Sequence, residues 1–251
     1  MSEKLEILRV ENVDKSFDDK LVLKDINIKL MRGELVSLVG VSGSGKTTLF
    51  NIIAGLLKPD KGKVFLKGED VTGRAGKISY MLQKDLLLPY MSIIDNVSLP
   101  LVLRGHKKKE AREIVEKHID IFGLEGFQEK YPSQLSGGMK QRANLLKTYL
   151  TSNDIMLLDE PFGALDSITR GKLQKWLVGL KKKTNSTILF ITHDIDEAIL
   201  ISDRIYVISE KPAIIKGEVK VDISRDNYEE ISLTKEFIEI KRNVLKLLGN
   251  T

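Results

Sequence analysis

The stretch GVSGSGKT, at residues 40–47, constrains the fold of this chain more than any other feature. It has the spacing G-x-x-x-x-G-K-[ST], follows the strand-like run ELVSLVG (residues 34–40) and opens the helix-like run TTLFNIIAGLL (residues 47–57). Glycines let the backbone wrap a phosphate chain, so that loop amides and the helix N-terminus point at it. The sequence therefore predicts an α/β fold with a phosphate-binding loop between a strand and a helix.

The residues of this loop have different expected tasks. Lys46 is expected to reach the β- and γ-phosphates of a nucleotide, and Thr47 to offer its hydroxyl to Mg²⁺. Thr48 offers a further hydroxyl to the α-phosphate. The other loop residues form the predicted cradle: Gly40, Val41, Ser42, Gly43, Ser44 and Gly45.

The rest of the chain alternates β-branched runs with helical patterns, which predicts parallel strands joined by helices. Strands of this kind are expected at KISYMLQ (77–83), DIMLLDE (154–160), STILFITHD (186–194) and RIYVIS (204–209). Antiparallel strands are expected at residues 5–17, 21–34 and 61–68. Amphipathic helices replace the strand pattern from residue 86 to 150, which predicts an inserted helical lobe.

Composition excludes several classes of protein. Hydrophobic residues make up 42% of the 251 and charged residues 30%, far from disordered or membrane-spanning chains. The sequence contains neither an apolar run of bilayer length nor the apolar core of a secretory signal at its start, so a cytosolic chain is expected. Zero cysteines exclude disulfides and thiolate metal sites. The net charge is +5, but the Lys and Arg residues are interspersed with Asp and Glu, so this charge does not by itself predict an anionic partner.

Two adjacent carboxylates end the apolar strand IMLLDE. Successive strand residues point to opposite sides, so Asp159 and Glu160 are expected to have different tasks. Asp159 is the natural partner of Mg²⁺ together with Thr47, while Glu160 can face an attacking water as general base. In isolation the pair could equally be a solvated strand end, and the phosphate loop is what favours the catalytic interpretation.

Three further side chains are candidates for the same site. His193 follows a strand at the edge where ligands gather in parallel sheets, and its imidazole could hold the γ-phosphate, the water and Glu160 in place. Gln83 ends another strand and could touch Mg²⁺ or the attacking water; a polar strand end is the alternative. Phe17 could stack on a base or could be a core residue of its strand.

A second anion-seeking segment is LSGGMKQR, at residues 135–142. Ser136 is a favourable N-cap, and Gly137 and Gly138 leave the backbone amides of the helix start bare. The loop at residues 40–47 is already expected to bind the phosphates of one nucleotide, so the second segment needs a separate explanation.

In this order the motifs resemble those of one family, the nucleotide-binding subunits of ATP-binding cassette (ABC) transporters. They are GVSGSGKT, Gln83, LSGGMKQR, IMLLDE, ALD at residues 164–166, and His193. The resemblance covers nearly the whole chain up to about residue 221. Departures are small: Met139 stands where glutamine is commoner, and Phe17 where tyrosine is common.

The resemblance implies an ATPase with bound ATP and Mg²⁺ and a P-loop NTPase (RecA-like) core. An antiparallel β subdomain and an inserted α-helical subdomain accompany that core. Residues 1–84 and 151–221 would form the ATP-binding core, residues 85–150 the helical subdomain with the signature LSGGMKQR, and residues 222–251 a helical tail. Lys46, Gln83, Glu160 and His193 would be the catalytic residues.

The resemblance also explains the second anion-seeking segment. Two subunits of this family lie head to tail, and each ATP lies between the phosphate loop of one and the signature of the other. Ser136, Gly137 and Gly138 would therefore meet the γ-phosphate bound by a second copy of the chain, and Asp166 would belong to the same nucleotide site. The closed pair would persist only while a triphosphate bridges the two surfaces.

Two segments, DLLLPYMSIIDNVSLPL (85–101) and PFGALDSITR (161–170), resemble importers of nitrate, sulfonates, taurine and related small molecules, with pyrimidine and riboflavin importers close by. The implied partners are transmembrane permease subunits, which would dock after Gln83, and indirectly an extracytoplasmic solute-binding protein. This places the chain at the cytoplasmic face of the membrane, with no nucleic acid expected.

Two other classes are weighed against the importer. A soluble cassette ATPase acting on nucleic acid or ribosomes would be marked by tandem cassettes, a coiled-coil insertion or zinc cysteines, none of which the sequence contains; only the basic charge favours it. A simple P-loop kinase or GTPase has no reason to carry LSGGMKQR together with ALD and His193.

Overall fold

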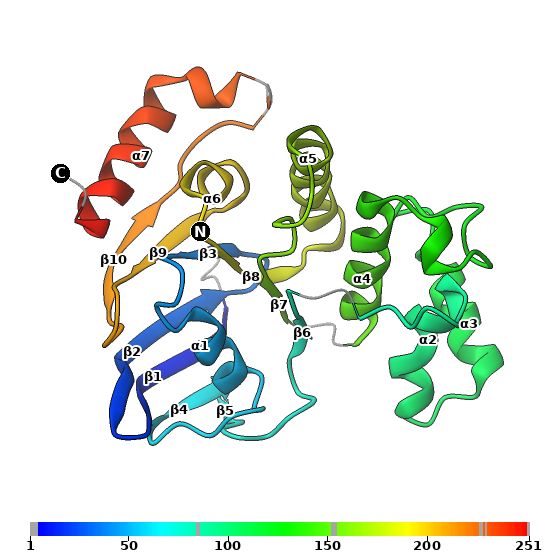
Figure 1. Ribbon diagram of the computed structural model, residues 1–251, viewed down its shortest axis with the longest axis horizontal. Helices are drawn as coiled ribbons and strands as arrows, with labels where there is room; N and C mark the ends of the chain where they lie inside the picture. Colours follow the sequence, from blue (N-terminus) through cyan, green and yellow to red (C-terminus); the bar gives the residue numbers. More distant parts are fainter. Residues whose placement is uncertain (1–4, 84–85, 152–154, 226–227, 229, 250–251) are drawn as a thin grey trace.

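The computed structural model describes residues 5–83, 86–151, 155–225, 228 and 230–249. Asp85 and Asp154, each the first residue of a segment quoted above, lie outside the described residues. The described part consists of two β-sheets with helices around them, and a group of helices lies to one side of the sheets (Figure 1). The predicted α/β fold, with an antiparallel sheet and helices inserted in the chain, is confirmed.

The larger sheet carries the phosphate loop. Its strand order is β10-β9-β3-β8-β7-β6, and every neighbouring pair is parallel except β10 with β9. Apolar runs such as LVSLV and TILFIT are buried over their whole length, as expected for parallel strands covered on both faces. The strands are β3 (Leu35–Val39), β6 (Ser79–Met81), β7 (Ile155–Asp159), β8 (Thr187–Thr192), β9 (Arg204–Ile208) and β10 (Ile215–Lys220).

The smaller sheet is antiparallel, as predicted, with the order β2-β1-β4-β5. Its strands are β1 (Glu6–Phe17), β2 (Lys20–Met31), β4 (Lys61–Leu66) and β5 (Glu69–Asp70). Helix α1 (Lys46–Ile53) supplies Leu49, Phe50 and Ile52 to the core that both sheets share. The helix that follows the phosphate loop is therefore fixed between two sheets. Because the loop is joined to the start of this helix, its position is fixed as well.

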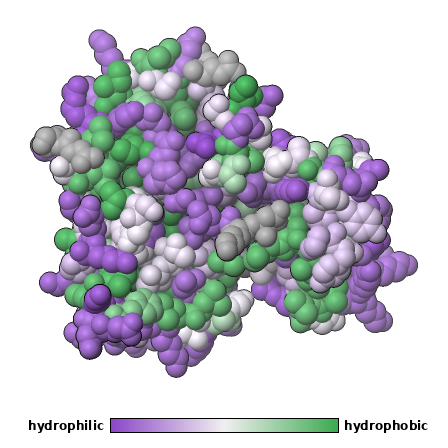
Figure 2. Space-filling model, viewed as in Figure 1, coloured by the Kyte–Doolittle hydropathy of each residue, from purple (hydrophilic) through white to green (hydrophobic). Residues whose placement is uncertain are grey.

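The group of helices at the right of Figure 1 comes from the stretch in which the strand pattern disappears. It contains α2 (Ile93–Leu103), α3 (Lys108–Glu116), the 3₁₀ turn η1 (Pro132–Gln134) and α4 (Gly137–Thr151). Val97, Val115 and Leu146 are buried in a second core that continues under the larger sheet. Figure 2 shows polar and apolar side chains interspersed over this face of the molecule.

Three helices and a 3₁₀ turn cover the remaining surface of the larger sheet: α5 (Ser167–Thr184), α6 (Ile195–Ile201), η2 (Ile231–Leu233) and α7 (Lys235–Leu248). In α7, Phe237, Ile240 and Val244 are buried against α6 and the β9–β10 edge. The edge strand β10 was not expected from the sequence, because its short run IKGEVK contains three charged residues and Gly217.

Candidate functional site

The phosphate loop connects β3 to α1, as the sequence predicts. Gly43 and Gly45 have φ of +78° and +107°, in the left-handed region that glycine adopts without strain. A Cβ atom on Gly40 would lie 2.5 Å from Cγ2 of Ile208, so a larger residue would not fit between the loop and β9. The loop is therefore closely packed at its first residue and bare at its centre, which suits a cradle for phosphates.

Lys46 lies under the loop rather than in solvent. Its side chain donates hydrogen bonds to the carbonyl oxygens of Gly40 (2.9 Å) and Val41 (2.8 Å), and the residue is buried. Burial lowers the pKa of Lys46, while the charges of Glu160 and Asp159 oppose that shift. The ammonium group is thus positioned within the loop beside two carboxylates, where an anionic ligand would favour its charged form.

Asp159 faces the start of α1. Its Oδ2 atom accepts hydrogen bonds from Oγ1 of Thr47 and from the hydroxyl of Tyr80, both at 3.1 Å. Burial raises the pKa of Asp159, and the two hydrogen bonds oppose the increase. The hydroxyl of Thr47 and the carboxylate of Asp159 are oxygen donors of the kind that Mg²⁺ prefers, and their separation fits an ion held between them and a phosphate.

Glu160 directly follows β7, and its hydrogen-bond partners differ from those of Asp159. Its Oε2 atom accepts a hydrogen bond from Nε2 of Gln83 at 3.1 Å, and its Oε1 atom lies 3.1 Å from Nδ1 of His193. Side chains that follow β6 and β8 thus converge on the one carboxylate that follows β7. A cavity of about 270 Å³ is lined by the phosphate loop, Gln83, both carboxylates and Lys211.

Phe17 ends β1 and is 45% exposed, which does not fit the alternative of a core residue. Nζ of Lys15 lies 5.4 Å from the centre of its ring. A hollow of about 420 Å³ lies beside the ring and is also lined by Val22, Lys211 and Pro212. An exposed aromatic ring beside an open hollow is suited to stacking on a planar base.

The signature segment lies apart from these residues. Oγ of Ser136 accepts a hydrogen bond from the amide of Met139 at 3.3 Å, so the predicted N-cap is present at the start of α4. A Cβ atom on Gly138 would lie 3.0 Å from Cγ2 of Thr169, so glycine allows α4 to approach α5. Among the described residues that line the 270 Å³ cavity, none comes from positions 136–138.

Asp166 is the N-cap of α5, and its Oδ1 atom accepts a hydrogen bond from the amide of Thr169 at 3.0 Å. This bond is the largest cause that lowers the pKa of the Asp166 carboxyl. The residue is exposed, so its carboxylate remains available to a partner.

Sequence reasoning missed Tyr80 and a buried acid behind His193. Glu197 is 6% exposed, and its Oε1 atom accepts a hydrogen bond from Nε2 of Gln174 at 2.8 Å. Burial raises the pKa of Glu197 above its ordinary value. Glu197 lines a small cavity of about 40 Å³ together with Glu160 and His193. The sequence signal for this buried acid was a glutamate four positions after His193, in the largely apolar run IDEAILI.

The sequence profile of the ABC transporter family matches residues 23–163. The chain belongs to this family. It is 41% identical to an uncharacterized ABC transporter ATP-binding protein of Methanocaldococcus jannaschii, over 96% of this chain and 91% of that protein. It is 40% identical to the formylaminopyrimidine import ATP-binding protein of Halalkalibacterium halodurans, over 96% and 94% of the two chains.

Solved structures of the same family have the same fold. A dimeric bacterial ABC transporter cassette superposes with a TM-score of 0.73 at 30% identity, over 87% of this chain and all of that one. A dimeric post-hydrolysis state with bound ADP and Pi gives a TM-score of 0.72 at the same identity and coverage. The ABC protein described here thus binds and hydrolyses ATP. No helix within the described ranges is long and apolar enough to cross a membrane.

Proposed function

We propose that this ABC protein is the ATP-hydrolysing subunit of an importer and that it works as a head-to-tail homodimer. The observation that carries the catalytic part is the convergence of Gln83 and His193 on the carboxylate of Glu160, beside the phosphate loop. A general base must be within hydrogen-bond reach of the water that it activates, and the 270 Å³ cavity leaves room for that water beside Glu160.

Each residue of the cavity has a distinct task in this proposal. The backbone amides of the cradle and Lys46 hold the phosphates, while Glu160 accepts a proton from the attacking water. His193 and Gln83 keep the Glu160 carboxylate oriented. Thr47, Asp159 and Gln83 would hold Mg²⁺, which when bound neutralises part of the charge on the phosphates. Phe17 stacks on the adenine, and Thr48 contacts the α-phosphate.

A second copy of the chain completes each site. The bare amides of Gly137 and Gly138, with Ser136, lie away from the cavity of their own chain, so they are free to contact the γ-phosphate bound by the partner. Asp166 of each copy contributes to the same interface. ATP then holds two surfaces together and ADP does not, because the two nucleotides differ only at the group that both surfaces contact.

The proposed transport direction and solute class follow the relatives. Proteins 36–43% identical to this chain are named as import ATP-binding proteins for formylaminopyrimidine, nitrate and aliphatic sulfonates, and as bicarbonate transport proteins. The solute proposed here is accordingly a nitrate-, sulfonate- or taurine-like molecule or a related small organic compound. An extracytoplasmic binding protein would capture it, and transmembrane permease subunits would conduct it.

The permease would dock on the segment after Gln83, which places the chain at the cytoplasmic face of the membrane. Leu86 is 52% exposed and Tyr90 is 74% exposed. Leu86 also lines a hollow of about 90 Å³ between the end of β6 and α4, together with Asn144 and Thr148. Exposed apolar side chains around a hollow support the docking of another protein there.

The catalytic assignment is tested with Glu160→Gln, which keeps the size of the side chain and removes its basicity. We expect ATP hydrolysis in the presence of Mg²⁺ to fall by at least about 100-fold, as for loss of a general base, while ATP binding is retained. Steady-state phosphate release and equilibrium nucleotide binding measure the two effects separately. Hydrolysis at the wild-type rate would remove Glu160 from the mechanism.

The import assignment needs the membrane partner. The chain is co-expressed with candidate multi-span membrane proteins, and each complex that forms is reconstituted into liposomes with a candidate solute-binding protein. We expect ATP hydrolysis to increase when a transported solute is added on the side of the binding protein. Stimulation by nucleic acid or ribosomes in place of the membrane proteins would favour the soluble alternative.

A further inference from the structure

The turn between β9 and β10, residues 209–214, is fixed against the antiparallel sheet. Ala213 donates its amide hydrogen to the carbonyl oxygen of Val22 and accepts one from the amide of Lys24, both at 2.9 Å. Oγ of Ser209 accepts a hydrogen bond from the amide of Ile214 at 2.9 Å. The turn is therefore held to β2 and also closed on itself, so the residue at its tip has a defined position.

Lys211, in this turn, lines two hollows at once. One is the 270 Å³ cavity around the phosphate loop, and the other is the 420 Å³ hollow beside Phe17. The strand before the turn also abuts the phosphate loop, since Ile208 leaves no room for a Cβ on Gly40. Lys211 therefore stands where the proposed phosphate and base sites meet.

The ammonium group of Lys211 is available for a ligand. The side chain is exposed, and within the part of the chain that the structure describes no carboxylate forms an ion pair with it. In the phosphate cavity the other lysine, Lys46, is already bonded to two loop carbonyls and lies beside two carboxylates. A phosphate group entering the cavity would thus find an additional cation at its rim.

We infer that Lys211 is a nucleotide-binding residue that contacts the ribose and α-phosphate part of ATP. This inference rests on the proposed function, in which the base lies on Phe17 and the terminal phosphates lie in the loop. The part of the nucleotide between those two ends is the part that would pass Lys211. Because ATP and ADP share this part, Lys211 strengthens the binding of both equally and does not sense the γ-phosphate.

The test is calorimetric titration of full-length protein with ADP and with the non-hydrolysable β,γ-imido analogue of ATP. Lys211→Met is compared with the wild type, with the rescue variant Lys211→Arg, and with Lys24→Met as a matched loss of one exposed lysine. We expect the Kd of both nucleotides to rise about tenfold in Lys211→Met, a value between an exposed ion pair and a hydrogen bond to a charged group. Lys211→Arg and Lys24→Met should stay within about threefold of the wild type. Thermal melting checks that all variants are folded.

The outcomes separate this inference from the proposed function. If the wild type itself binds neither nucleotide, the proposed function fails. If the wild type binds both and Lys211→Met does so equally well, only the role of Lys211 is overturned. A loss confined to the triphosphate analogue would also overturn it, because it would place Lys211 at the γ-phosphate. A loss in Lys24→Met as large as in Lys211→Met would show a general charge effect and would overturn it as well.

Discussion

Glu160 has a backbone conformation that residues other than glycine rarely adopt. Its φ is +44°, and its two carboxylate oxygens are engaged by Gln83 and His193. Such a conformation costs on the order of 1 kcal/mol or more and persists only where the surroundings enforce it. The strained turn directs the carboxylate into the cavity beside the phosphate loop, so we interpret the strain as part of the proposed catalytic arrangement.

Glu197, the buried acid near Glu160 and His193, predicts a specific pH dependence of the protein's stability. Burial raises the folded-state pKa of Glu197 above its ordinary value of 4.5, so the native state binds a proton more tightly than the unfolded state. The resulting stabilisation is complete below the ordinary pKa and is lost as pH rises through the raised value. Glu197→Gln keeps the bond with Gln174 and removes the titration.

We therefore expect the free energy of unfolding of the wild type, relative to Glu197→Gln, to increase as pH falls from 7 to 5. Urea denaturation at a series of pH values measures both proteins, and the difference isolates Glu197 from Asp159, whose pKa is raised in both. A difference that stays constant over this range would mean that Glu197 titrates normally in the folded protein.

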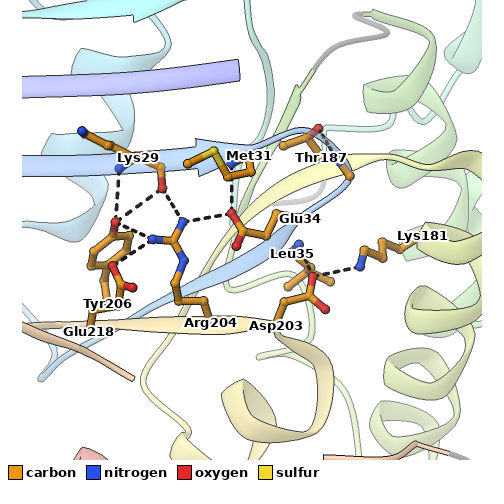
Figure 3. A network of polar contacts seen from close by, with 11 residues as sticks. Lys29, Met31, Glu34, Leu35, Lys181, Thr187, Asp203, Arg204, Tyr206 and Glu218 are labelled. Atoms are coloured by element: carbon orange, nitrogen blue, oxygen red, sulfur yellow. Dashed lines mark hydrogen bonds and ion pairs between the residues drawn. The ribbon is translucent and has the colours of Figure 1, made fainter. Parts of the chain in front are cut away.

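At the scale of the structural elements, a polar network around Arg204 connects the two sheets (Figure 3). The guanidinium of Arg204 donates to Oε2 of Glu34 (2.9 Å), to Oε2 of Glu218 (2.8 Å) and to the carbonyl oxygen of Lys29 (2.7 Å). These partners come from β10, from the end of β2 and from the residue before β3. Glu34 is 8% exposed, and its Oε2 atom also accepts a hydrogen bond from the amide of Met31 at 2.9 Å.

Replacing Arg204 with methionine should destabilise the fold by about 3 kcal/mol, because it leaves Glu34 buried without a counter-charge. The midpoint of urea denaturation measures the effect. Lys220→Met is the control, since Lys220 pairs with Asp222 where both side chains are largely exposed, and it should leave the midpoint unchanged. Equal midpoints for the two variants would show that the network contributes nothing to stability.

Much of the element pattern could be predicted from the sequence, because apolar runs at strand length and a glycine-rich loop carry strong local signals. The convergence of Gln83, Glu160 and His193 was expected for the same reason, since all three follow strands of one parallel sheet. Tyr80 and Lys211 could not be found in this way. Both reach the site through tertiary packing, and Lys211 lies in the turn before β10, an edge strand whose short run IKGEVK is half charged and contains Gly217.

The whole molecule holds its two anion-seeking segments on separate regions. The phosphate loop lies between β3 and α1, whereas the start of α4 lies beside α5. Ser136 is not among the described residues that line the phosphate cavity of its own chain. A second copy of the chain is therefore expected to complete each nucleotide site, and the dimeric cassettes with the same fold support this expectation.

Sedimentation velocity in saturating ATP and Mg²⁺ tests this shared-site claim most directly, with Glu160→Gln compared against Glu160→Gln combined with Ser136→Arg. We expect the single variant to sediment as a dimer, because ATP persists at both nucleotide sites of the interface. The double variant should remain a monomer that still binds ATP, because the arginine obstructs only the contact with the partner's γ-phosphate. If the double variant also dimerises, or if its monomer no longer binds ATP, then Ser136 does not complete the nucleotide site of a second chain.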